Sequence, residues 1–445
     1  LNGTSKLDGV QVDLDGNGML ELGNAANSIS GLTGSGALNN GSALEITTAG
    51  NALYEGSLSG EGSITMNGTG TQVLKGNGAI GQALSVTKGT LELTGAEGGN
   101  GSVTYKSLTA GSGAHVRLSP VGEGTGAVNT TLTVANGLNL QNSHLDLVIN
   151  TNRDDLFSSP VITVQAGDVN LDGTTVSLGS LGDYDDPADP TANLNFTLVD
   201  ATGAGTVSAN GATVDASGYF DFYYQEFGIR TEGGKIVVTG MVKTENAFMD
   251  AANTANSEAG ANLLWNNRGN APKGTQLGDL REAVRNDIQS GNTSRAARSM
   301  AAAAGSTVNA LGTAQRDALR DQMGWIRNRT TLMGVNPAYV NEDLPCFHMW
   351  MEGTGSYAKL DTRGDESGYQ LTTWGGTVGM DVDLSDHFTM GAAFTANYGD
   401  LTASAADSAD GHLDSYYASL FGRYQDRRWA HTLILTGGWN DAKLN

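Results

Sequence analysis

The feature that most constrains this chain is an alternation of apolar with small or polar side chains, with period two, over residues 347–440. It divides into five segments of roughly ten to fifteen residues, a length that suits strands crossing a layer of hydrocarbon. Alternate side chains of a strand point to opposite faces. The apolar face of the third segment carries Phe388, Met390, Ala392, Phe394, Ala396 and Tyr398. We infer strands with one face suited to hydrocarbon and one face that tolerates water. The alternative is an antiparallel sheet of a soluble β-sandwich, whose apolar face packs on a protein core.

The connections between these segments alternate in length. Residues 361–368 and 402–412 form long connections, whereas residues 385–386 and 426–428 form short ones. Outer-membrane barrels combine long outside loops with short periplasmic turns and carry aromatic girdles at both interfaces. The aromatic residues expected near strand ends are Trp350, Tyr369, Tyr398, Tyr424, Trp429 and Trp439.

Four runs stand in this region in the following order: MWMEGTGSY at 349–357, GGTVGMD at 375–381, MGAAF at 390–394 and DSYYASLFG at 414–422. They resemble the start of the translocator barrel of autotransporters, the family of type V secretion. The resemblance implies an antiparallel transmembrane β-barrel in the bacterial outer membrane, in contact with outer-membrane lipid and inserted by the barrel-assembly machinery. Because a barrel must close, we expect residues 346–445 to be its first five strands and the sequence to be a piece of a longer chain.

Residues 1–120 repeat a short apolar run and a turn rich in Gly, Asn, Ser and Thr. The chain has 63 glycines, 7 prolines and only 16% charged residues, which fits many turns between short strands. Strands this short need stacked neighbours, so the repeat predicts a parallel β-solenoid whose rungs share an apolar column. Residues 58–74 and 86–93 resemble the passenger-associated repeat of autotransporters. We therefore expect a mainly β chain that begins with a right-handed parallel β-solenoid passenger.

Two further regions separate this solenoid from the barrel strands. Residues 121–243 keep short strands but add large aromatic side chains, among them Phe157, Tyr219, Phe220, Phe222, Tyr223, Tyr224 and Phe227. They are similar to the cap that closes a passenger and helps it fold; further rungs are the alternative. From residue 244 to 345 the composition shifts to Ala, Asn, Arg, Asp and Met, which predicts a helical linker. Helical spacing is clearest over residues 276–289 and 313–332.

The resemblance implies a helix that threads the barrel lumen before the first strand, and we assign it to residues 313–329. We predict that its arginines face carboxylates of the lumen; a surface helix with solvated arginines is the alternative. The residues of this predicted pairing are Arg316, Arg320 and Arg327 on the helix with Glu352, Asp381 and Asp383 on the strands.

Charge and cysteine usage exclude several classes of partner. The net charge of −22 argues against nucleic acid or an anionic membrane surface. The single cysteine, Cys346, excludes a disulfide within the chain. The six histidines have no metal-ligand spacing, so we expect neither metal nor cofactor. No apolar run reaches the roughly 18 residues of a transmembrane helix.

Three short motifs match known functional signatures in part. Residues 76–81 fit G-x-G-x-x-G, but a strand pattern and not a helix follows, which excludes a pyrophosphate site at a helix N-terminus. Residues 13–18 resemble the start of an EF-hand loop, but Asn24 stands where a bidentate Glu is required. The tripeptide Arg363, Gly364 and Asp365 falls in the first outside loop and is a candidate adhesion motif, with chance occurrence as the alternative.

These observations predict an autotransporter that translocates and displays its own solenoid at the cell surface. Stacked rungs offer long faces and no pocket, so we expect an adhesin-like or structural passenger, not an enzyme, with a possible host or surface ligand. The G-x-S-x-G and G-D-S-G signatures of serine hydrolases are absent. Two alternatives stay open: an enzymatic part preceding Leu1, and a soluble structural solenoid.

Overall fold

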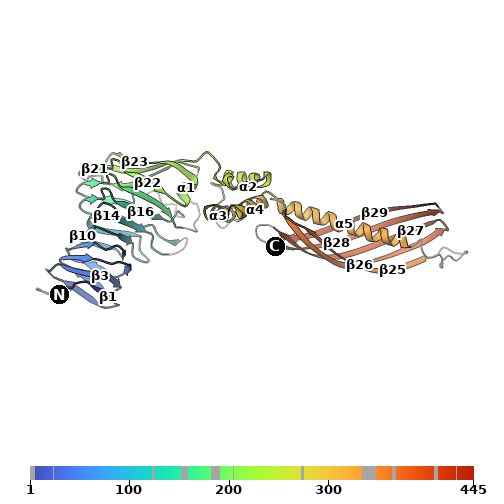
Figure 1. Cartoon of the computed structure of the whole chain (residues 1–445), viewed down its shortest axis with the longest axis horizontal. Coiled ribbons are helices and arrows are strands. Elements are labelled where there is room, and N and C mark those ends of the chain that lie inside the picture. The colour runs from blue at the N-terminus through green and yellow to red at the C-terminus, as the bar shows by residue number, and fades with distance from the viewer. Residues whose placement is uncertain are drawn as a thin grey trace. The chain divides into compact units, whose positions relative to one another are not determined.

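The computed structural model describes residues 6–23, 25–122, 126–151, 159–181, 191–203, 205–271, 275–332, 347–362, 367–404, 409–426 and 428–444. The chain divides into two compact units. Figure 1 shows the chain coloured by residue number. Unit 1 comprises residues 1–247 and 267–282, and unit 2 comprises residues 248–266 and 283–445. The finer division at residues 120, 243 and 345 stays a prediction.

Unit 1 is built almost entirely of short strands. The first half of the series is β1 (Val10–Leu14), β2 (Met19–Leu22), β3 (Asn27–Gly34), β4 (Ala37–Asn40), β5 (Ala43–Ile46), β6 (Asn51–Tyr54), β7 (Ser57–Ser59), β8 (Ser63–Met66), β9 (Thr71–Lys75), β10 (Gly78–Val86), β11 (Thr90–Thr94) and β12 (Ser102–Ala110). The second half is β13 (His115–Ser119), β14 (Thr131–Val134), β15 (Leu138–Asn139), β16 (His144–Ile149), β17 (Ile162–Val164), β18 (Val169–Asn170), β19 (Thr175–Ser180), β20 (Leu194–Asp200), β21 (Val207–Ser208), β22 (Thr213–Ala216), helix α1 (Tyr219–Tyr223), β23 (Tyr224–Glu232) and β24 (Lys235–Val242).

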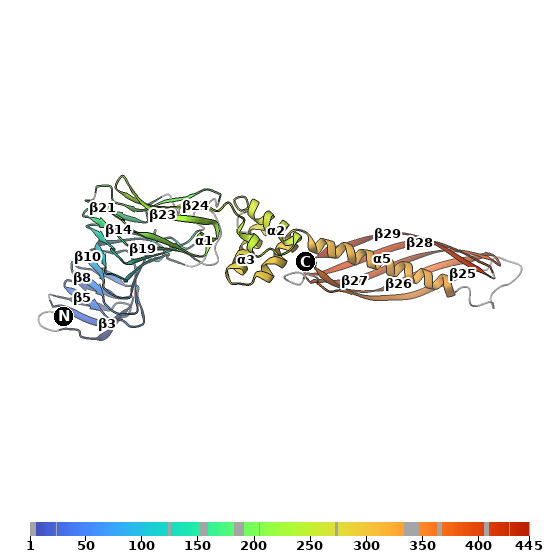
Figure 2. The same cartoon turned by 45° about the horizontal axis from the view of Figure 1, so that its top comes forward.

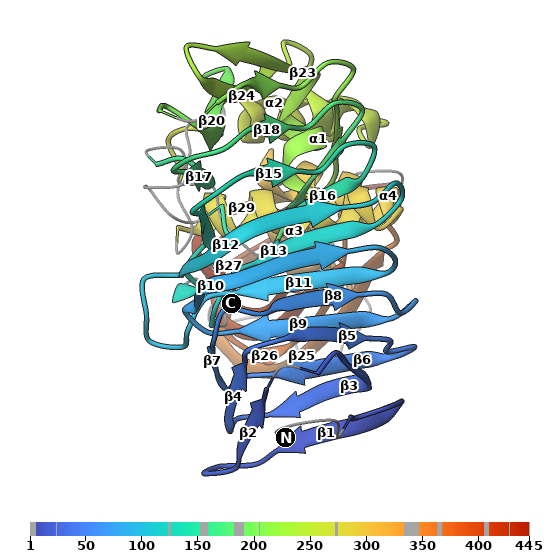
Figure 3. The same ribbon diagram turned by 90° about the vertical axis from the view of Figure 1, so that its left-hand side faces the viewer.

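Strands β1 to β22 stack as the rungs of a parallel solenoid. Most strands inside the stack pair in parallel with one from the rung before and one from the rung after, as in the series β6, β9, β11, β13, β16, β19 and β22. Figure 3 shows the rungs following one another in chain order. Backbone N–H and C=O groups are thereby satisfied between rungs, which strands of four or five residues cannot do alone. The predicted parallel β-solenoid is confirmed.

Inward side chains form continuous apolar columns. Leu44, Ile64, Leu84 and Leu108 lie one above the other and are each no more than 2% exposed. Each buried aliphatic side chain of this size contributes about 1.5–3 kcal/mol. The column continues through Leu138 to β18. Because each residue covers only its neighbours, the core exists only when several rungs are stacked.

The length of a rung grows along unit 1. Ala43 pairs with Ser63, so an early rung takes 20 residues, whereas Thr175 pairs with Thr213, a rung of 38. The strands stay short, so the added residues lie in the connections between them. This explains why the repeat is plain in the first part of the sequence and fades after it.

The parallel stack ends in an antiparallel cover. Strand β24 pairs antiparallel with β20 and with β23, and α1 beside them buries Tyr219, Phe220 and Tyr223. Large aromatic side chains therefore close this end of the core, in agreement with the aromatic residues noted in the sequence.

Glycine is required where rungs approach most closely. A Cβ added at Gly56 would overlap the carbonyl oxygen of Gly36 and the Tyr54 ring. The Tyr54 hydroxyl lies 2.9 Å from the carbonyl oxygens of Gly36 and Ser57, and burial raises its pKa to about 12. The high glycine content thus follows from backbone contact between rungs as well as from turns.

Buried amide side chains interrupt the apolar columns, and Gln72 is one of them. Gln72 is 0% exposed and occupies an inward position between Ala52 and Leu91. Its Nε2 donates to the carbonyl oxygens of Leu32, at 2.9 Å, and of Ala52, at 3.2 Å, while its Oε1 accepts from the Leu32 N–H at 3.1 Å. A single side chain therefore joins three consecutive rungs.

We predict that Gln72→Leu destabilises the first rungs by about 2 kcal/mol, because buried backbone groups at Leu32 and Ala52 lose their partner. Amide hydrogen exchange measured by mass spectrometry on peptides from β3, β6 and β9 should accelerate. The matched control is Gln225→Leu, at an exposed position of β23, which should leave these peptides unchanged. Equal exchange in both variants would contradict the bridging role of Gln72.

Beyond the solenoid the chain turns helical. The helices are the short η2 (Ala247–Asp250), α2 (Ala255–Asn266), α3 (Gln276–Gln289), which contains the division between the units, α4 (Thr293–Ala303) and α5 (Ser306–Leu332). The sequence predicted α3 and most of α5. Helices α2 and α4 pack closely in unit 2, since a Cβ at Gly260 would overlap the Met300 carbonyl oxygen. Among the residues described, no helix combines the length and apolarity needed to cross a membrane.

Unit 2 ends in a five-stranded antiparallel sheet, β25 (Phe347–Leu360), β26 (Gly368–Ser385), β27 (Phe388–Ser404), β28 (Ala409–Asp426) and β29 (Trp429–Leu444), each paired with its neighbours in chain order. The predicted connection at 402–412 is wrong in extent, because β27 and β28 run into it. Cross-strand polar pairs explain the extension: Thr402 Oγ1 donates to Asp410 Oδ1 at 3.0 Å, and His412 Nδ1 lies 3.2 Å from Asp400.

Candidate functional site

The two faces of the five-stranded sheet differ sharply. Phe388, Met390, Phe394 and Tyr398 are between 38% and 45% exposed, whereas Thr395, between two of them, is 0% exposed. Apolar side chains of β26, β28 and β29 are exposed in the same way: Trp374, Val378, Leu420, Leu433, Leu435 and Trp439. The outer face is thus a broad apolar surface, far larger than the isolated apolar residues of an ordinary soluble surface. The predicted outward orientation of these residues is confirmed.

Two of the expected girdle aromatics lie on the inner face instead. Tyr369 is 1% exposed, and its hydroxyl donates to Asp317 Oδ2 at 2.5 Å. Trp350 is packed against the hydrophobic cluster around Ile326. The prediction failed because proximity to a strand end does not fix the face; only the parity of the position does.

Helix α5 lies along the inner face and contacts all five strands (Figure 2). The residues that it buries recur every four positions, which places them on one side of a helix. At its first end Ala310, Ala314 and Ala318 pack on large side chains of the sheet. These partners are Tyr369, Leu371, Leu401 and Leu413. Small helix residues against large strand residues allow a close approach.

The middle of the interface is polar. Gln322, the next residue in the same stripe, is 0% exposed, and its Nε2 donates to Thr395 Oγ1 at 2.6 Å. Thr395 and Thr377 share a hydrogen bond of 2.7 Å, and Thr354 donates to Asn397 at 2.8 Å. The inner face therefore carries a band of hydroxyl and amide groups across neighbouring strands.

A charged cluster follows at the other end of α5. After Ile326, which packs on Ala393 and Phe421, Arg329 Nη2 lies 3.6 Å from Asp381 Oδ1, with the guanidinium 5.2 Å from the centre of the Trp350 ring. His348 Nδ1 lies 3.3 Å from Asp381 Oδ2. The carboxylate is 3% exposed and the Arg329 side chain 30%, so water screens this pair only partly.

Carbonyl groups at the last turn of α5 are also held. Arg423 of β28 donates through Nη1 to the carbonyl oxygens of Thr330 and Thr331. A cation at the C-terminal end of a helix satisfies free carbonyl groups and interacts favourably with the helix dipole. Both ends and the middle of α5 are therefore anchored to the sheet.

The arginines of α5 differ in how they lie relative to the carboxylates of the sheet. Arg316, Arg320 and Arg327 are exposed, and among the described residues no ion pair joins them to Glu352, Asp381 or Asp383. Glu352 is exposed, and Asp383 accepts a hydrogen bond from Thr389 at 2.5 Å. The pairing of those three arginines stays a prediction, while Arg329 contacts Asp381. The four-residue spacing of Ala310, Ala314, Ala318, Gln322 and Ile326 was the signal that marks the buried side.

Two other expectations concern different parts of the chain. The tripeptide Arg363, Gly364 and Asp365 lies outside the described residues. Within the described ranges, no three His, Cys, Asp or Glu side chains are grouped so that they could hold a metal ion.

The order of apolar, polar and charged zones gives α5 one axial position. A shift of one turn, four residues, would place Gln322 against the Leu-rich partners of Ala318 and Ile326 against the hydroxyl band. Burying an unpaired amide costs roughly 1–3 kcal/mol. The inner face consequently selects one register of the helix.

We predict that Arg329→Met loosens the last turns of α5 by on the order of 2 kcal/mol, less than the 3–5 kcal/mol of a fully buried pair, because Asp381 is left without its cation. Hydrogen exchange of the peptide covering residues 319–332 should accelerate. The control Arg327→Met, two residues earlier and exposed, should leave exchange unchanged. If both variants exchange alike, the contact with Asp381 does not anchor the helix.

A comparison with known families agrees with this arrangement. The model of one family, described as the autotransporter beta-domain, matches residues 349–445. No curated protein and no solved structure matches the chain.

Proposed function

Residues 349–445 belong to the autotransporter β-domain family, and on this premise we propose that the solenoid of unit 1 is an adhesin-like or structural passenger. The autotransporter β-domain is an outer-membrane β-barrel that displays a passenger outside the cell, so the chain is part of a type V secreted protein. This domain is a secretion module and not a catalyst, and its insertion generally uses the barrel-assembly machinery.

The observation that carries the proposal is the pairing of an outward apolar face with a helix seated on the inward face. Exposed Phe394 and Leu420 suit lipid, while the buried polar band around Thr395 suits a lumen. Helix α5 would be the segment that remains in the lumen and connects passenger to barrel. Its register, set by Gln322 and Arg329, supports this role.

The solenoid suits export without an external energy source. Each early rung needs only 20 residues and hydrogen-bonds to the edge of the rung before it. A chain that emerges unfolded can add rungs one at a time on such an edge, and each addition buries further apolar surface. Folding outside the cell would thus draw the chain outward.

The outward faces of the rungs support a structural or adhesive role. Cations there are held between carboxylates of the neighbouring rungs: Lys75 lies 2.6 Å from Glu55 and 3.3 Å from Glu97. Arg117 lies 3.6 Å from Glu92 and 3.8 Å from Asp146. Such ladders add rigidity through a network rather than through one exposed pair, and a rigid rod presents a long surface to a partner.

We predict that bacteria expressing the full-length protein attach to surfaces or to one another several-fold better than bacteria expressing a version without residues 1–243. A tag in the exposed turn at residues 15–18 should be labelled by antibody on intact cells, which checks display. The two strains are compared at equal amounts of β-domain, so that a difference in attachment reflects the passenger and not expression. Equal attachment by the two strains contradicts an adhesin-like passenger, and a tag that is labelled only after lysis contradicts display.

The same assay tests the separate prediction for the tripeptide Arg363, Gly364 and Asp365. Asp365→Glu retains the charge but changes the reach of the carboxylate. Attachment that falls to the level of the strain without residues 1–243 would support the tripeptide as the adhesive motif. Unchanged attachment would remove it.

A further inference from the structure

Two histidines lie side by side on neighbouring rungs of the solenoid. His115 is the first residue of β13 and His144 is the first residue of β16, and the two are direct partners in the parallel pairing of these strands. Their rings are stacked, with centroids 4.3 Å apart and planes 6° from parallel. The stacking of rungs thus brings together two imidazoles that lie far apart in the sequence.

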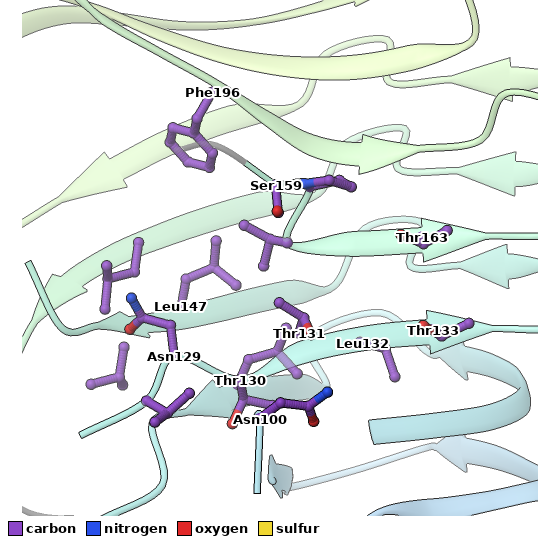
Figure 4. Close-up of a pocket in the computed structure, with 16 residues that line it drawn as sticks. Asn100, Asn129, Thr130, Thr131, Leu132, Thr133, Leu147, Ser159, Thr163 and Phe196 are labelled. Atoms are coloured by element: carbon purple, nitrogen blue, oxygen red, sulfur yellow. The ribbon is translucent and has the colours of Figure 1, made fainter. Parts of the chain in front are cut away.

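The alternation of side chains along β16 places this pair on the outer face of the solenoid. Leu145 and Leu147 point inward and are no more than 2% exposed, and Figure 4 shows Leu147 beside an interior cavity of about 330 Å³. His144 and Asp146 occupy the alternate, outward positions, and the His115 side chain is 38% exposed. An ion from solvent can therefore reach the two rings without entering the core.

Asp146 orients the ring of His115. Its Oδ2 lies 3.0 Å from His115 Nδ1. A carboxylate only accepts hydrogen bonds, so in the neutral ring we assign the hydrogen to Nδ1, which leaves the lone pair on Nε2. A histidine that binds a metal is commonly held by a carboxylate in this way. Asp146 is accordingly a positioning residue, and His115 Nε2 is the nitrogen that is ready to bind.

The ring nitrogens that such an ion needs are not engaged elsewhere. Among the described residues, neither His115 Nε2 nor the ring nitrogens of His144 have a hydrogen-bond or ion-pair partner. A Zn–N bond measures about 2.0–2.1 Å, so two nitrogens on one ion lie at most about 4.2 Å apart. The rings are already spaced close to this limit. A rotation of each ring about its Cβ–Cγ bond would turn one nitrogen of each toward a shared ion.

The charges around the pair favour a cation. Arg117 lies 3.6 Å from Glu92 and 3.8 Å from Asp146, so one guanidinium is shared between two carboxylates. With neutral imidazoles this cluster keeps a net negative charge, in a chain whose net charge is −22. A negative surface raises the local concentration of cations.

We propose that His115 and His144 together bind one divalent ion of the late first-row transition metals, with Cu²⁺ held most tightly. Neutral imidazole suits Zn²⁺, Ni²⁺ and Cu²⁺, and Cu²⁺ stands highest in the general order of affinity. Two protein ligands agree with the finding that no three such side chains are grouped among the described residues. The remaining positions of the ion are open to water or to a donor of another molecule, and the ion joins two neighbouring rungs.

The test is a calorimetric titration of the full chain in detergent with Cu²⁺, Ni²⁺ and Zn²⁺, at a pH of about 7.5, where ordinary imidazole is neutral. His115→Asn and His144→Asn should each weaken Cu²⁺ binding by more than about 10-fold, the lower limit when even an outer-shell partner is lost. Asp146→Asn should weaken it about 10-fold for the same reason. The matched control is His431→Asn, at an exposed position of β29, which should leave this site unchanged.

Two further measurements report on the pair itself. Electron paramagnetic resonance of the Cu²⁺ complex should detect two imidazole nitrogens in the unaltered chain and one in either histidine variant. Amide exchange of the β13 and β16 peptides should slow when the ion is added to the unaltered chain, and not in the variants. Exchange without metal verifies that each variant is folded.

Equal Cu²⁺ binding by His144→Asn and His431→Asn overturns the proposal, and so does a spectrum with a single imidazole nitrogen in the unaltered chain. Binding should weaken as the pH falls below about 6.5, because protons compete for the imidazoles. Undiminished binding at a pH of about 5 would assign the ion to carboxylates and refute the histidine pair. These outcomes are independent of cell attachment, so they leave the adhesive function to its own assay.

Discussion

The constraint on which both units depend is the pairing of backbone hydrogen-bonding groups. An unpaired N–H or C=O is costly wherever water is excluded, whether in a solenoid core or in lipid. Unit 1 meets this demand with parallel strands from successive rungs, and unit 2 meets it with long antiparallel strands in chain order. The same period-two alternation then decides what each sheet faces: a dry interior in unit 1, and an apolar exterior with a polar inner face in unit 2.

The sequence allowed much of this to be predicted because alternation and turn residues are local signals. The outward position of Phe394 and Tyr398 followed from parity, and the bounds of α3 followed from helical spacing and flanking glycine. The sequence prediction placed Tyr369 and Trp350 on the outer face because they lie near strand ends. The alternation of side chains along each strand, which decides the face, places both on the inner face. The widening of rungs from 20 to 38 residues hid the later rungs, since insertions in the connections destroy a fixed period.

The site was harder to predict than the fold. Charge drew attention to Arg316, Arg320 and Arg327, yet the side of α5 that contacts the sheet is set by Ala310, Ala314 and Ala318, whose only distinction is small size. A helix reaches a curved inner face most closely where its side chains are small, so packing and not charge determined its orientation.

Both units place a glutamine in a buried stripe that is otherwise mainly apolar: Gln72 in unit 1, where Gln82 is buried as well, and Gln322 in unit 2. Apolar contacts vary little with a shift of one position, because aliphatic side chains of similar size replace one another at small cost. A buried amide tolerates a shift far less well, because the shift leaves its donors and acceptors without partners where water is excluded. Gln72 therefore fixes the alignment of three rungs, and Gln322 fixes α5 along the sheet. In both units the apolar surface supplies most of the attraction, and buried polar side chains select the register in which it acts.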